Sequence, residues 1–325
     1  MTKLRLTVAI GAYEINRALL EGAVTADGLD LVFVSRMGSQ ELVSRMIRAR
    51  EFDVAETGLN YIVNAAAKGQ PAGFIGVPIF THRRFRHGFA FVNSASGIRN
   101  PKDLIGQKVS SMYLPTGNVW MRGILEEFYG VPYKDVKWVG ERMGLYQMTP
   151  SWHEMPGPGV RGQDLLVEGK VAAMVCPDLP PLVAKKDPRI AQLFPRYWEE
   201  EVAYYKQTDI FPIMHSLIIK QEIAERYPWV VTNLIKAFDE SKKLALKKLI
   251  NPRYVPLAFF RTAYDQQQEL LGSDPWPYAL PESNRKNLQT FMRYMIQQEM
   301  LDKEVPVDKL FAPFDLEDAT PDDWN

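Results

Sequence analysis

The hydrophobic pattern of the first part of the chain alternates between strand-like and helix-like segments. Short apolar runs typical of buried strands lie at residues 4–10, 29–34, 52–56 and 74–80. Segments whose apolar positions follow a helical spacing lie between them, around residues 16–20, 40–48 and 59–67. Strands that alternate with helices in this way predict a parallel sheet covered on both faces.

A second set of strands and helices begins near residue 103. Its strand-like runs lie at residues 103–111, 136–139 and 171–176, and its helices end near residue 129 and cover residues 162–168. The chain then offers one more strand at residues 214–219 and continues as helices, with a long one at 229–249.

The natural crossing points between the two sets are residues 94–97 and 197–205. We therefore predict a discontinuous α/β lobe, residues 1–95 together with 206–325, which carries the C-terminal helices. Residues 96–205 are predicted to form an inserted second α/β lobe.

Length and charge narrow the classes of partner. At 325 residues the chain is long enough for two domains of about 150 residues each, and 46% apolar residues supply their cores. Lys plus Arg and Asp plus Glu both number 39, so the net charge is zero and we expect no nucleic-acid partner and no membrane partner. Recognition of an anion must then be local.

Cys176 is the single cysteine, which excludes an intramolecular disulfide and a multi-cysteine metal site.

The amino-terminal apolar run is short and already alternating, which is typical of a strand and not of a signal peptide. No run approaches the roughly 18 apolar residues that a membrane span needs. We therefore expect a cytoplasmic protein. The sequence leaves a homo-oligomer open.

A basic segment, residues 82–87, contains three arginines and two of the four histidines. Because it lies between two strand-like runs, we expect a sheet to hold its backbone. Read as an extended chain, the segment alternates between two faces. One face carries His82, Arg84 and Arg86, and the other carries Arg83, Phe85 and His87. The segment is a candidate anion site with proton donors, and a solvated basic loop is the alternative.

Several segments together resemble the 4,5-dihydroxyphthalate decarboxylase family. They are residues 52–56, 83–87, 97–99 with 101–106, 120–125 and 211–215. The most specific are Arg83-Arg84-Phe85-Arg86-His87 and Ile213-Met214-His215. The order of the predicted elements is similar to the type II periplasmic binding protein fold, and the resemblance spans roughly residues 4–250.

The resemblance implies an enzyme with a two-lobed fold and a ligand cleft between the lobes. It implies a cytoplasmic carboxy-lyase of aromatic compound catabolism and phthalate degradation. Its substrate would be a hydroxylated aromatic carboxylate or dicarboxylate, such as 4,5-dihydroxyphthalate, which would give protocatechuate. The chain departs from the family around residues 152–157, so a different substrate follows if this loop borders the ligand. The alternative is a solute-binding protein for a small aromatic or organic anion, which needs no proton donor.

Such a decarboxylation needs no cofactor in principle. A ring hydroxyl supplies electron density, the carboxylate-bearing carbon takes a proton, and carbon dioxide leaves. The enzyme needs an acid and a clamp for the anion, and arginine suits the clamp because its planar fork binds a carboxylate at two points. Arg84 and Arg86 are favoured because they share a face, and Arg83 is less favoured. A surface ion pair is the alternative for each.

Arg122, in the helix that follows Thr116, Gly117 and Asn118, is the candidate for substrate binding from the second lobe. A helix start exposes backbone donors that favour negative charge, and a simple helix cap at Thr116 is the alternative. Tyr13, just after the first strand, is expected to face the crevice and bond a ring hydroxyl. Core packing is its alternative.

His215, His87 and Glu56 compete for the role of proton donor. His215 stands in an otherwise apolar strand, so it is either a core histidine or a catalytic one. His87 lies beside three arginines, whose field suits it to holding a hydroxyl. Glu56 ends a strand at the edge that faces a ligand in parallel sheets, and an ion pair between lobes is its alternative. Convergence of these residues with His82 is left open, and no metal is favoured because the histidines show no spacing motif.

Overall fold

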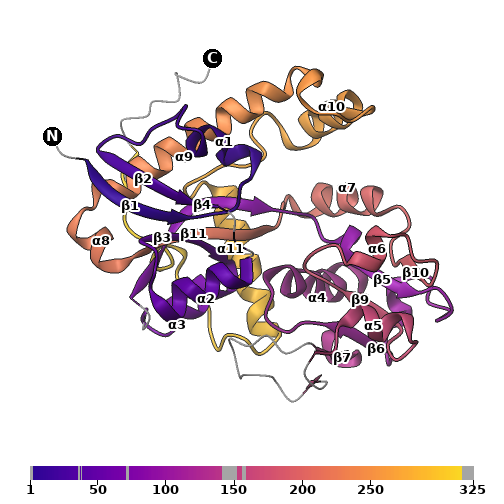
Figure 1. The fold of residues 1–325 in the computed structure, drawn as a ribbon. Coiled ribbons are helices and arrows are strands. Elements are labelled where there is room, and N and C mark those ends of the chain that lie inside the picture. The colour runs from indigo at the N-terminus through magenta and orange to yellow at the C-terminus, as the bar shows by residue number, and fades with distance from the viewer. Residues whose placement is uncertain are drawn as a thin grey trace. The chain divides into compact units, whose positions relative to one another are not determined.

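The computed structural model describes residues 3–35, 37, 39–70, 73–140, 152–155 and 159–316. The chain divides into two units (Figure 1). Unit 1 comprises Met1–Arg83, His215–Arg285 and Val305–Asn325, and unit 2 comprises Arg84–Met214 and Lys286–Glu304. Each unit is built from one sheet with helices, so the predicted α/β class is confirmed.

Unit 1 is built on a five-stranded sheet in the order β2-β1-β3-β11-β4. The strands are β1 (Leu4–Ala9), β2 (Leu29–Val34), β3 (Val54–Gly58), β4 (Phe74–Arg83) and β11 (Ile213–Lys220). β1 runs parallel to β2 and β3, whereas β11 runs antiparallel to β3. The start of β11 therefore lies at the edge of the sheet where β1 and β3 end.

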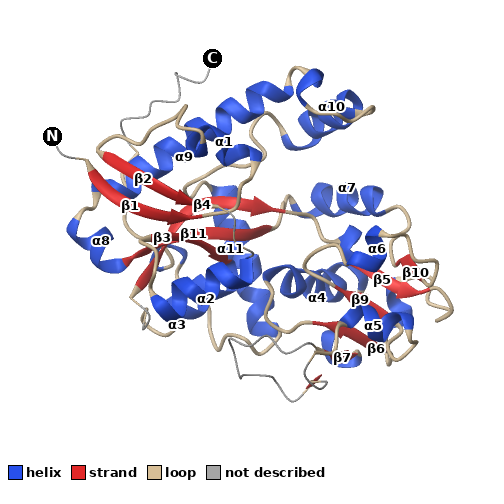
Figure 2. Ribbon diagram, in the orientation of Figure 1, coloured by secondary structure: helices blue, strands red, loops and turns tan. Residues whose placement is uncertain are grey.

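Helices cover both faces of this sheet (Figure 2). The helices α1 (Arg17–Leu20) and α9 (Trp229–Leu249) lie on one face, and α2 (Ser39–Ala49) and α3 (Leu59–Ala67) lie on the other (Figure 1). The remaining helices of this unit are α8 (Gln221–Arg226) and α10 (Phe260–Leu271). In α9 the buried side chains include Val231, Leu234 and Phe238, whose helical spacing makes the apolar stripe that packs inward.

Unit 2 is built on a six-stranded sheet in the order β10-β5-β9-β6-β7-β8. The strands are β5 (Ala90–Asn93), β6 (Lys108–Ser111), β7 (Lys137–Val139), β8 (His153–Glu154), β9 (Ala173–Val175) and β10 (Ile190–Gln192). β6 runs parallel to β7 and β9, and β5 runs antiparallel to β9 and β10. The helices are α4 (Thr116–Tyr129), α5 (Gly162–Val167), α6 (Pro181–Ala184), α7 (Tyr197–Thr208) and most of α11 (Glu282–Gln297).

Helix α4 is the core helix of unit 2. Every residue from Thr116 to Leu125 is buried, and Met121 and Leu125 pack with Trp138 of β7. Glycine is required at position 123, because a Cβ there would lie 2.2 Å from the Tyr294 ring of α11. No helix among the described residues combines the length and the apolar character needed to cross a membrane.

The unit boundaries fall at different residues from those predicted for the lobes. Residues 84–95 lie in unit 2, because β5 pairs with β9 and β10 of that sheet. Residues 206–214 and 286–304 also lie in unit 2, the latter because α11 packs on α4. The basic segment is divided as well, since β4 ends at Arg83 and a short 3-10 turn begins at His87. The segment is therefore not a continuous strand, since Arg86 already has helical backbone angles.

Candidate functional site

A group of polar side chains, hereafter the His215 cluster, lies at the carboxyl edge of the sheet in unit 1. Its members are Tyr13, Glu56, His82 and His215. Glu56 of β3 pairs with Leu217 of β11, so Glu56 and His215 share a face of the sheet one diagonal step apart. Tyr13 follows β1, and His82 is the last residue but one of β4. In open α/β sheets this edge is where ligands bind.

Glu56 is the buried acceptor of the His215 cluster. Its Oε1 lies 2.5 Å from His215 Nδ1 and accepts a hydrogen bond from the Tyr13 hydroxyl at 2.8 Å. Its Oε2 accepts from the N–H of Gly11 at 3.0 Å. Burial raises the pKa of the Glu56 carboxyl, but the hydrogen bond and charge of His215, with the bonds from Gly11 and Tyr13, hold it below its ordinary value of 4.5. Glu56 is therefore a carboxylate at neutral pH and orients its donors.

The contact with Glu56 determines how His215 is presented. Because the carboxylate accepts, Nδ1 of His215 carries a proton and Nε2 is left for chemistry. The His215 side chain is 22% exposed, whereas that of Glu56 is 5% exposed. The His82 ring centroid lies 5.0 Å from that of His215, edge to face, and 5.9 Å from that of Tyr13. The structure thus brings Tyr13, Glu56 and His215 together, along with a histidine to which no role was assigned from the sequence.

A second polar group, hereafter the Arg86 cluster, lies in unit 2. It consists of Arg84, Arg86, Phe89 and residues 176–178. The Cζ atoms of Arg84 and Arg86 lie 4.8 and 4.5 Å from the Phe89 ring centroid. Arg86 Nη2 donates to the carbonyls of Cys176 at 2.5 Å and Pro177 at 3.1 Å, and Arg84 forms an ion pair with Asp178 at 3.2 Å. Since residues 176–178 follow β9, this cluster also lies at the carboxyl edge of its sheet.

The guanidinium of Arg86 lies against the first turn of α4. Arg86 is 1% exposed, and a Cβ on Gly117 would lie 2.7 Å from its Cζ. Nε of Arg86 has no hydrogen-bond acceptor among the described residues. Helix α4 begins at Thr116 after Pro115, and no side chain caps it. A buried cationic donor beside an uncapped helix start forms a binding site suited to an anion.

Burial, and next the charge of Arg84, lower the pKa of Arg86 to about 10. Arg86 therefore keeps its positive charge at neutral pH.

Arg122 is fully buried and is bonded to other residues of unit 2. Its Nε donates to Gln298 Oε1 at 2.7 Å, Nη1 to Ser111 Oγ at 2.9 Å, and Nη2 to the carbonyl of Tyr113 at 2.5 Å. Asn118 Nδ2 also donates to Ser111 Oγ, at 3.0 Å. Because every nitrogen of Arg122 has a protein acceptor, this residue positions the segment between β6 and α4.

Arg83 lies in unit 1 and takes no part in the Arg86 cluster. Its Nη2 donates to the side chain of Asn284 and, at 3.1 Å, to the carbonyl of Pro277. The side chain is 6% exposed. These contacts indicate a structural role for Arg83, which links the end of β4 to the segment that leads into α11.

His87 lies inside an aromatic cage in unit 2. It is 0% exposed, and its ring centroid lies 5.2 Å from that of Phe194, 5.7 Å from Tyr204 and 5.8 Å from Tyr129. Neither ring nitrogen has a hydrogen-bond partner among the described residues. Burial, and next the charge of Arg86, lower its pKa to about 3, so the ring is neutral at neutral pH. In this position His87 contributes to the core of unit 2.

Glu201 was not singled out in the sequence, because nothing distinguishes it within the acidic run at 199–201. Its Oε1 accepts from the N–H of Gly88 at 3.3 Å. Burial raises its pKa to about 7, although the bond from Gly88 and the charge of Arg86 act in the opposite direction. A carboxyl group that titrates near neutrality by Arg86 is a further candidate for proton handling.

The loop that departs from the family is described in part. Pro156 and Gly157 lie outside the described residues. His153 Nε2 lies 2.7 Å from the carbonyl of Ser111, and burial, then the charge of Arg122, lower its pKa to about 4. His153 thus bonds the end of β6.

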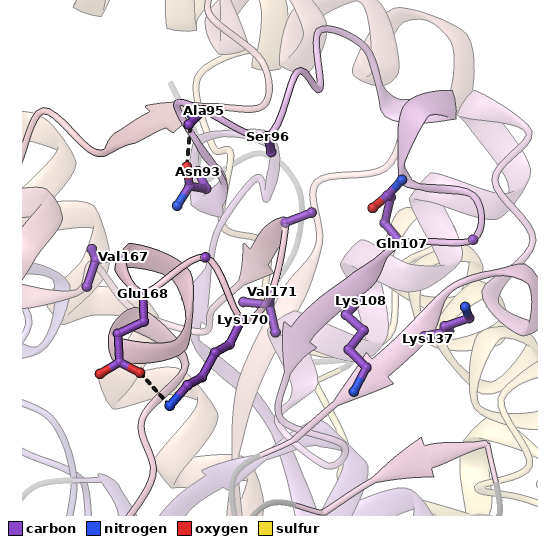
Figure 3. Close-up of a pocket in the computed structure, with 13 residues that line it drawn as sticks. Asn93, Ala95, Ser96, Gln107, Lys108, Lys137, Val167, Glu168, Lys170 and Val171 are labelled. Carbon is purple, nitrogen blue, oxygen red and sulfur yellow. Dashed lines mark hydrogen bonds and ion pairs between the residues drawn. The ribbon is translucent and has the colours of Figure 1, made fainter.

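A hollow of about 610 Å³ lies at the opposite edge of the sheet in unit 2 (Figure 3). Lys108, Lys137 and Lys170 line it together with Glu168, which pairs with Lys170 at 2.7 Å (Figure 3). The hollow lies at the amino ends of β6, β7 and β9, away from the carboxyl ends that hold the Arg86 cluster. Among the residues that the structure describes, no group of three His, Cys, Asp or Glu side chains is arranged to hold a metal ion.

Known proteins match both the sequence and the fold. The chain is 32% identical over 331 residues to a 4,5-dihydroxyphthalate decarboxylase of Comamonas testosteroni, a match that covers 98% of this chain and 99% of the relative. It is 30% identical over 212 residues to a 4,5-dihydroxyphthalate decarboxylase of Pseudomonas putida, covering 60% of this chain and 78% of the relative. The chain belongs to the 4,5-dihydroxyphthalate decarboxylase family. The predicted enzyme class, a carboxy-lyase, is confirmed by this membership.

No family model matches the chain. Among solved structures, it is similar to the periplasmic aliphatic sulphonate binding protein SsuA from Escherichia coli, with a TM-score of 0.57 and 14% identity. That match covers 96% of this chain and 98% of the other. At this identity the likeness concerns the fold alone, and it confirms the predicted periplasmic binding protein-like fold.

Proposed function

We propose that this chain removes one carboxylate, as carbon dioxide, from a hydroxylated aromatic dicarboxylate. The first candidate substrate is 4,5-dihydroxyphthalate, which would give protocatechuate. Two observations support the proposal. Two relatives carry the name of that activity, one of them aligned over nearly the whole chain. The His215 cluster also contains the groups that such a reaction requires.

The chemistry moves protons at two positions of the ring. A base takes the proton of the hydroxyl para to the leaving carboxylate, and electron density moves into the ring. The carbon that bears the carboxylate then takes a proton from an acid. The bond from this carbon to the carboxylate breaks, its electron pair returns to the ring, and carbon dioxide leaves. One proton is consumed overall, and the phenolate recovers the proton that the base took.

In this proposal His215 is the acid. A carboxylate at Nδ1 is a favourable partner for a protonated imidazole, so Glu56 both orients His215 and compensates its charge. Tyr13 shares the same carboxylate oxygen and is suited to bonding a ring hydroxyl.

The Arg86 cluster is the proposed binding site for the carboxylate that the substrate retains. Arg86 offers a buried cation whose Nε has no acceptor among the described residues. The start of α4, which no side chain caps, lies against this guanidinium at Gly117, whereas the N–H of Asn118 already donates to the carbonyl of Pro115 at 2.9 Å. Arg84, 33% exposed and paired with Asp178, adds positive charge beside it. Arg122 supports this site indirectly, because it donates hydrogen bonds to the carbonyls of Met112 and Tyr113 in the segment that precedes α4.

The observation that carries the proposal is the buried Glu56 bonded to His215. A protein that only binds an anion needs cationic groups such as those of the Arg86 cluster, but it has no use for an imidazole backed by a buried carboxylate. A solute-binding protein is therefore the weaker alternative.

The test is incubation of the chain with a panel of dihydroxybenzene mono- and dicarboxylates, followed by measurement of carbon dioxide release. We expect turnover of 4,5-dihydroxyphthalate, with protocatechuate as the product. His215→Gln should lower kcat by about 10²- to 10⁴-fold while calorimetry still detects ligand binding. Lys137→Gln, in the hollow at the other edge of unit 2, is the matched control and should keep full activity. Tight binding without turnover across the panel would refute the proposal and favour the binding protein.

A further inference from the structure

A second imidazole lies beside His215. His82 belongs to β4, and its ring meets that of His215 edge to face, with centroids 5.0 Å apart and an interplanar angle of 82°. The same ring lies 5.9 Å from Tyr13. His82 is half-buried, and it shares the carboxyl edge of the sheet with Glu56 and His215.

The proposed reaction requires two proton carriers. The hydroxyl that loses its proton and the carbon that gains one lie on opposite sides of a six-membered ring. One imidazole cannot lie within hydrogen-bonding distance of both at the same time. If His215 delivers the proton to carbon, another group must accept the proton from the hydroxyl.

The other members of the His215 cluster are poorly suited to that role. Glu56 already accepts hydrogen bonds from Gly11, Tyr13 and His215, and those contacts favour its ionised form. Tyr13 donates its hydroxyl proton to Glu56. A phenol that donates in this way can bond the substrate but is a weak base at neutral pH. His82 is the remaining member of the cluster, and a neutral imidazole has a basic ring nitrogen that can accept a proton.

We propose that His82 is the base that accepts the hydroxyl proton, while His215 is the acid that protonates the ring carbon. This rests on the proposed function. In this assignment the reaction begins with the proton on His215, beside the Glu56 carboxylate, and with a neutral His82. As His215 gives its proton to carbon and His82 takes one from the hydroxyl, the pair keeps a single positive charge. Two like charges therefore never face each other across the edge-to-face contact.

The variant His82→Gln tests the assignment through the pH dependence of kcat. At neutral pH we expect kcat to fall by about 10²- to 10⁴-fold with KM changed by less than about tenfold. As the pH rises toward about 10, where a phenol loses its proton unaided, kcat of His82→Gln should recover relative to that of the wild type. His215→Gln should show no such recovery, since ionisation of the substrate does not replace the acid.

The matched control is Thr81→Val, the neighbouring residue of β4 on the other face of the strand. Thr81 is 3% exposed, and its hydroxyl has no hydrogen-bond partner among the described residues, so valine fits there. This variant should keep the wild-type kcat at every pH. His82→Asn serves as a second probe if His82→Gln unfolds, because asparagine is shorter and also lacks a titrating group.

Two results would overturn the assignment of His82. One is a kcat within about threefold of wild type at neutral pH. The other is a loss of kcat in the folded variant, His82→Gln or its substitute His82→Asn, that stays constant up to high pH, as a structural defect would produce. Failure of the proposed function gives a different result, because the wild-type chain itself would then release no carbon dioxide.

Discussion

Replacing Glu56 with glutamine removes the charge at the centre of the His215 cluster and keeps the size of the side chain. The carboxylate accepts hydrogen bonds from Gly11, Tyr13 and His215. A hydrogen bond to a charged group contributes about 1.5–3 kcal/mol, and glutamine still offers one acceptor oxygen. We therefore expect the free energy of unfolding to fall by about 2–4 kcal/mol, measured by urea denaturation.

The effect of Glu56→Gln on turnover should exceed its effect on stability. Glutamine carries no charge and has one acceptor oxygen in place of two. If that oxygen takes the place of Oε1, it no longer compensates the charge of a protonated His215, and if the amide is turned, an N–H group faces Nδ1 of His215. Proton transfer by a correctly placed group contributes about 10²- to 10⁴-fold to a rate. We expect kcat for carbon dioxide release to fall in that range, which corresponds to about 3–5 kcal/mol of barrier. KM should change little, because the proposed carboxylate site is the Arg86 cluster.

Asp53→Asn is the matched control for this variant. Asp53 lies just before β3 and also accepts three hydrogen bonds, two from Thr7 and one from Lys220. Removal of its charge should lower stability by about 1–3 kcal/mol but leave kcat at the wild-type level. An equal loss of kcat in Asp53→Asn and Glu56→Gln would show that the activity responds to stability alone, and the reasoning about His215 would fail.

The pH dependence of stability gives a second readout for Glu56→Gln. The folded-state pKa of Glu56 lies below the ordinary 4.5, so the contribution of its charge is complete above pH 4.5. It is lost as the pH falls through the folded-state pKa. The difference in unfolding free energy between wild type and Glu56→Gln should therefore be constant above pH 4.5 and shrink below it. A difference that grows on acidification would contradict the direction of the shift.

Two further variants address unit 2. Gly117→Ala places a methyl group 2.7 Å from Cζ of Arg86, so the buried guanidinium must shift. We expect KM for the carboxylate substrate to rise by about 10- to 100-fold together with some loss of stability, and an unchanged KM would remove Arg86 as the clamp. His87→Phe removes a ring whose pKa falls from 6.5 to about 3 on folding, which costs the wild type about 4–5 kcal/mol of stability as the pH drops through that window. The variant should lose less stability on acidification and keep its kcat, and a large loss of kcat would return His87 to the active site.

The strands and helices could be predicted because their signals are local. The alternation of apolar runs gives β1, β2, β3 and β4 from neighbouring residues alone. Arg84 and Arg86 could also be grouped from their spacing, and both lie on the Phe89 ring. The spacing could not show that Arg83 faces Asn284, because that depends on how the chain folds back to β4.

The partners of the site residues depend on contacts between distant segments. Glu56 and His215 meet because β11 pairs antiparallel with β3 in one register, and a shift by one residue would send His215 to the other face. We predicted Arg122 to bind substrate because an arginine close to the start of a helix suits an anion. Its acceptors, Ser111 and Gln298, come from the two separate segments of the chain that make up unit 2 and carry no recognisable signal. The sequence shows that a side chain is charged, but it does not show which hydrogen-bond or ion-pair partners that side chain has in the folded protein.

The position of β11 has a consequence for the order in which the molecule is made. β11 lies between β3 and β4 in the sheet, yet it leaves the ribosome only after the whole of residues 84–212. Until then β3 and β4 lack their common neighbour, and both present unpaired backbone groups that can pair with other chains. His215 arrives on that same strand. Completion of the sheet and assembly of the His215 cluster are therefore one event, and a nascent chain that stops short of β11 has neither a finished unit 1 nor the proposed acid.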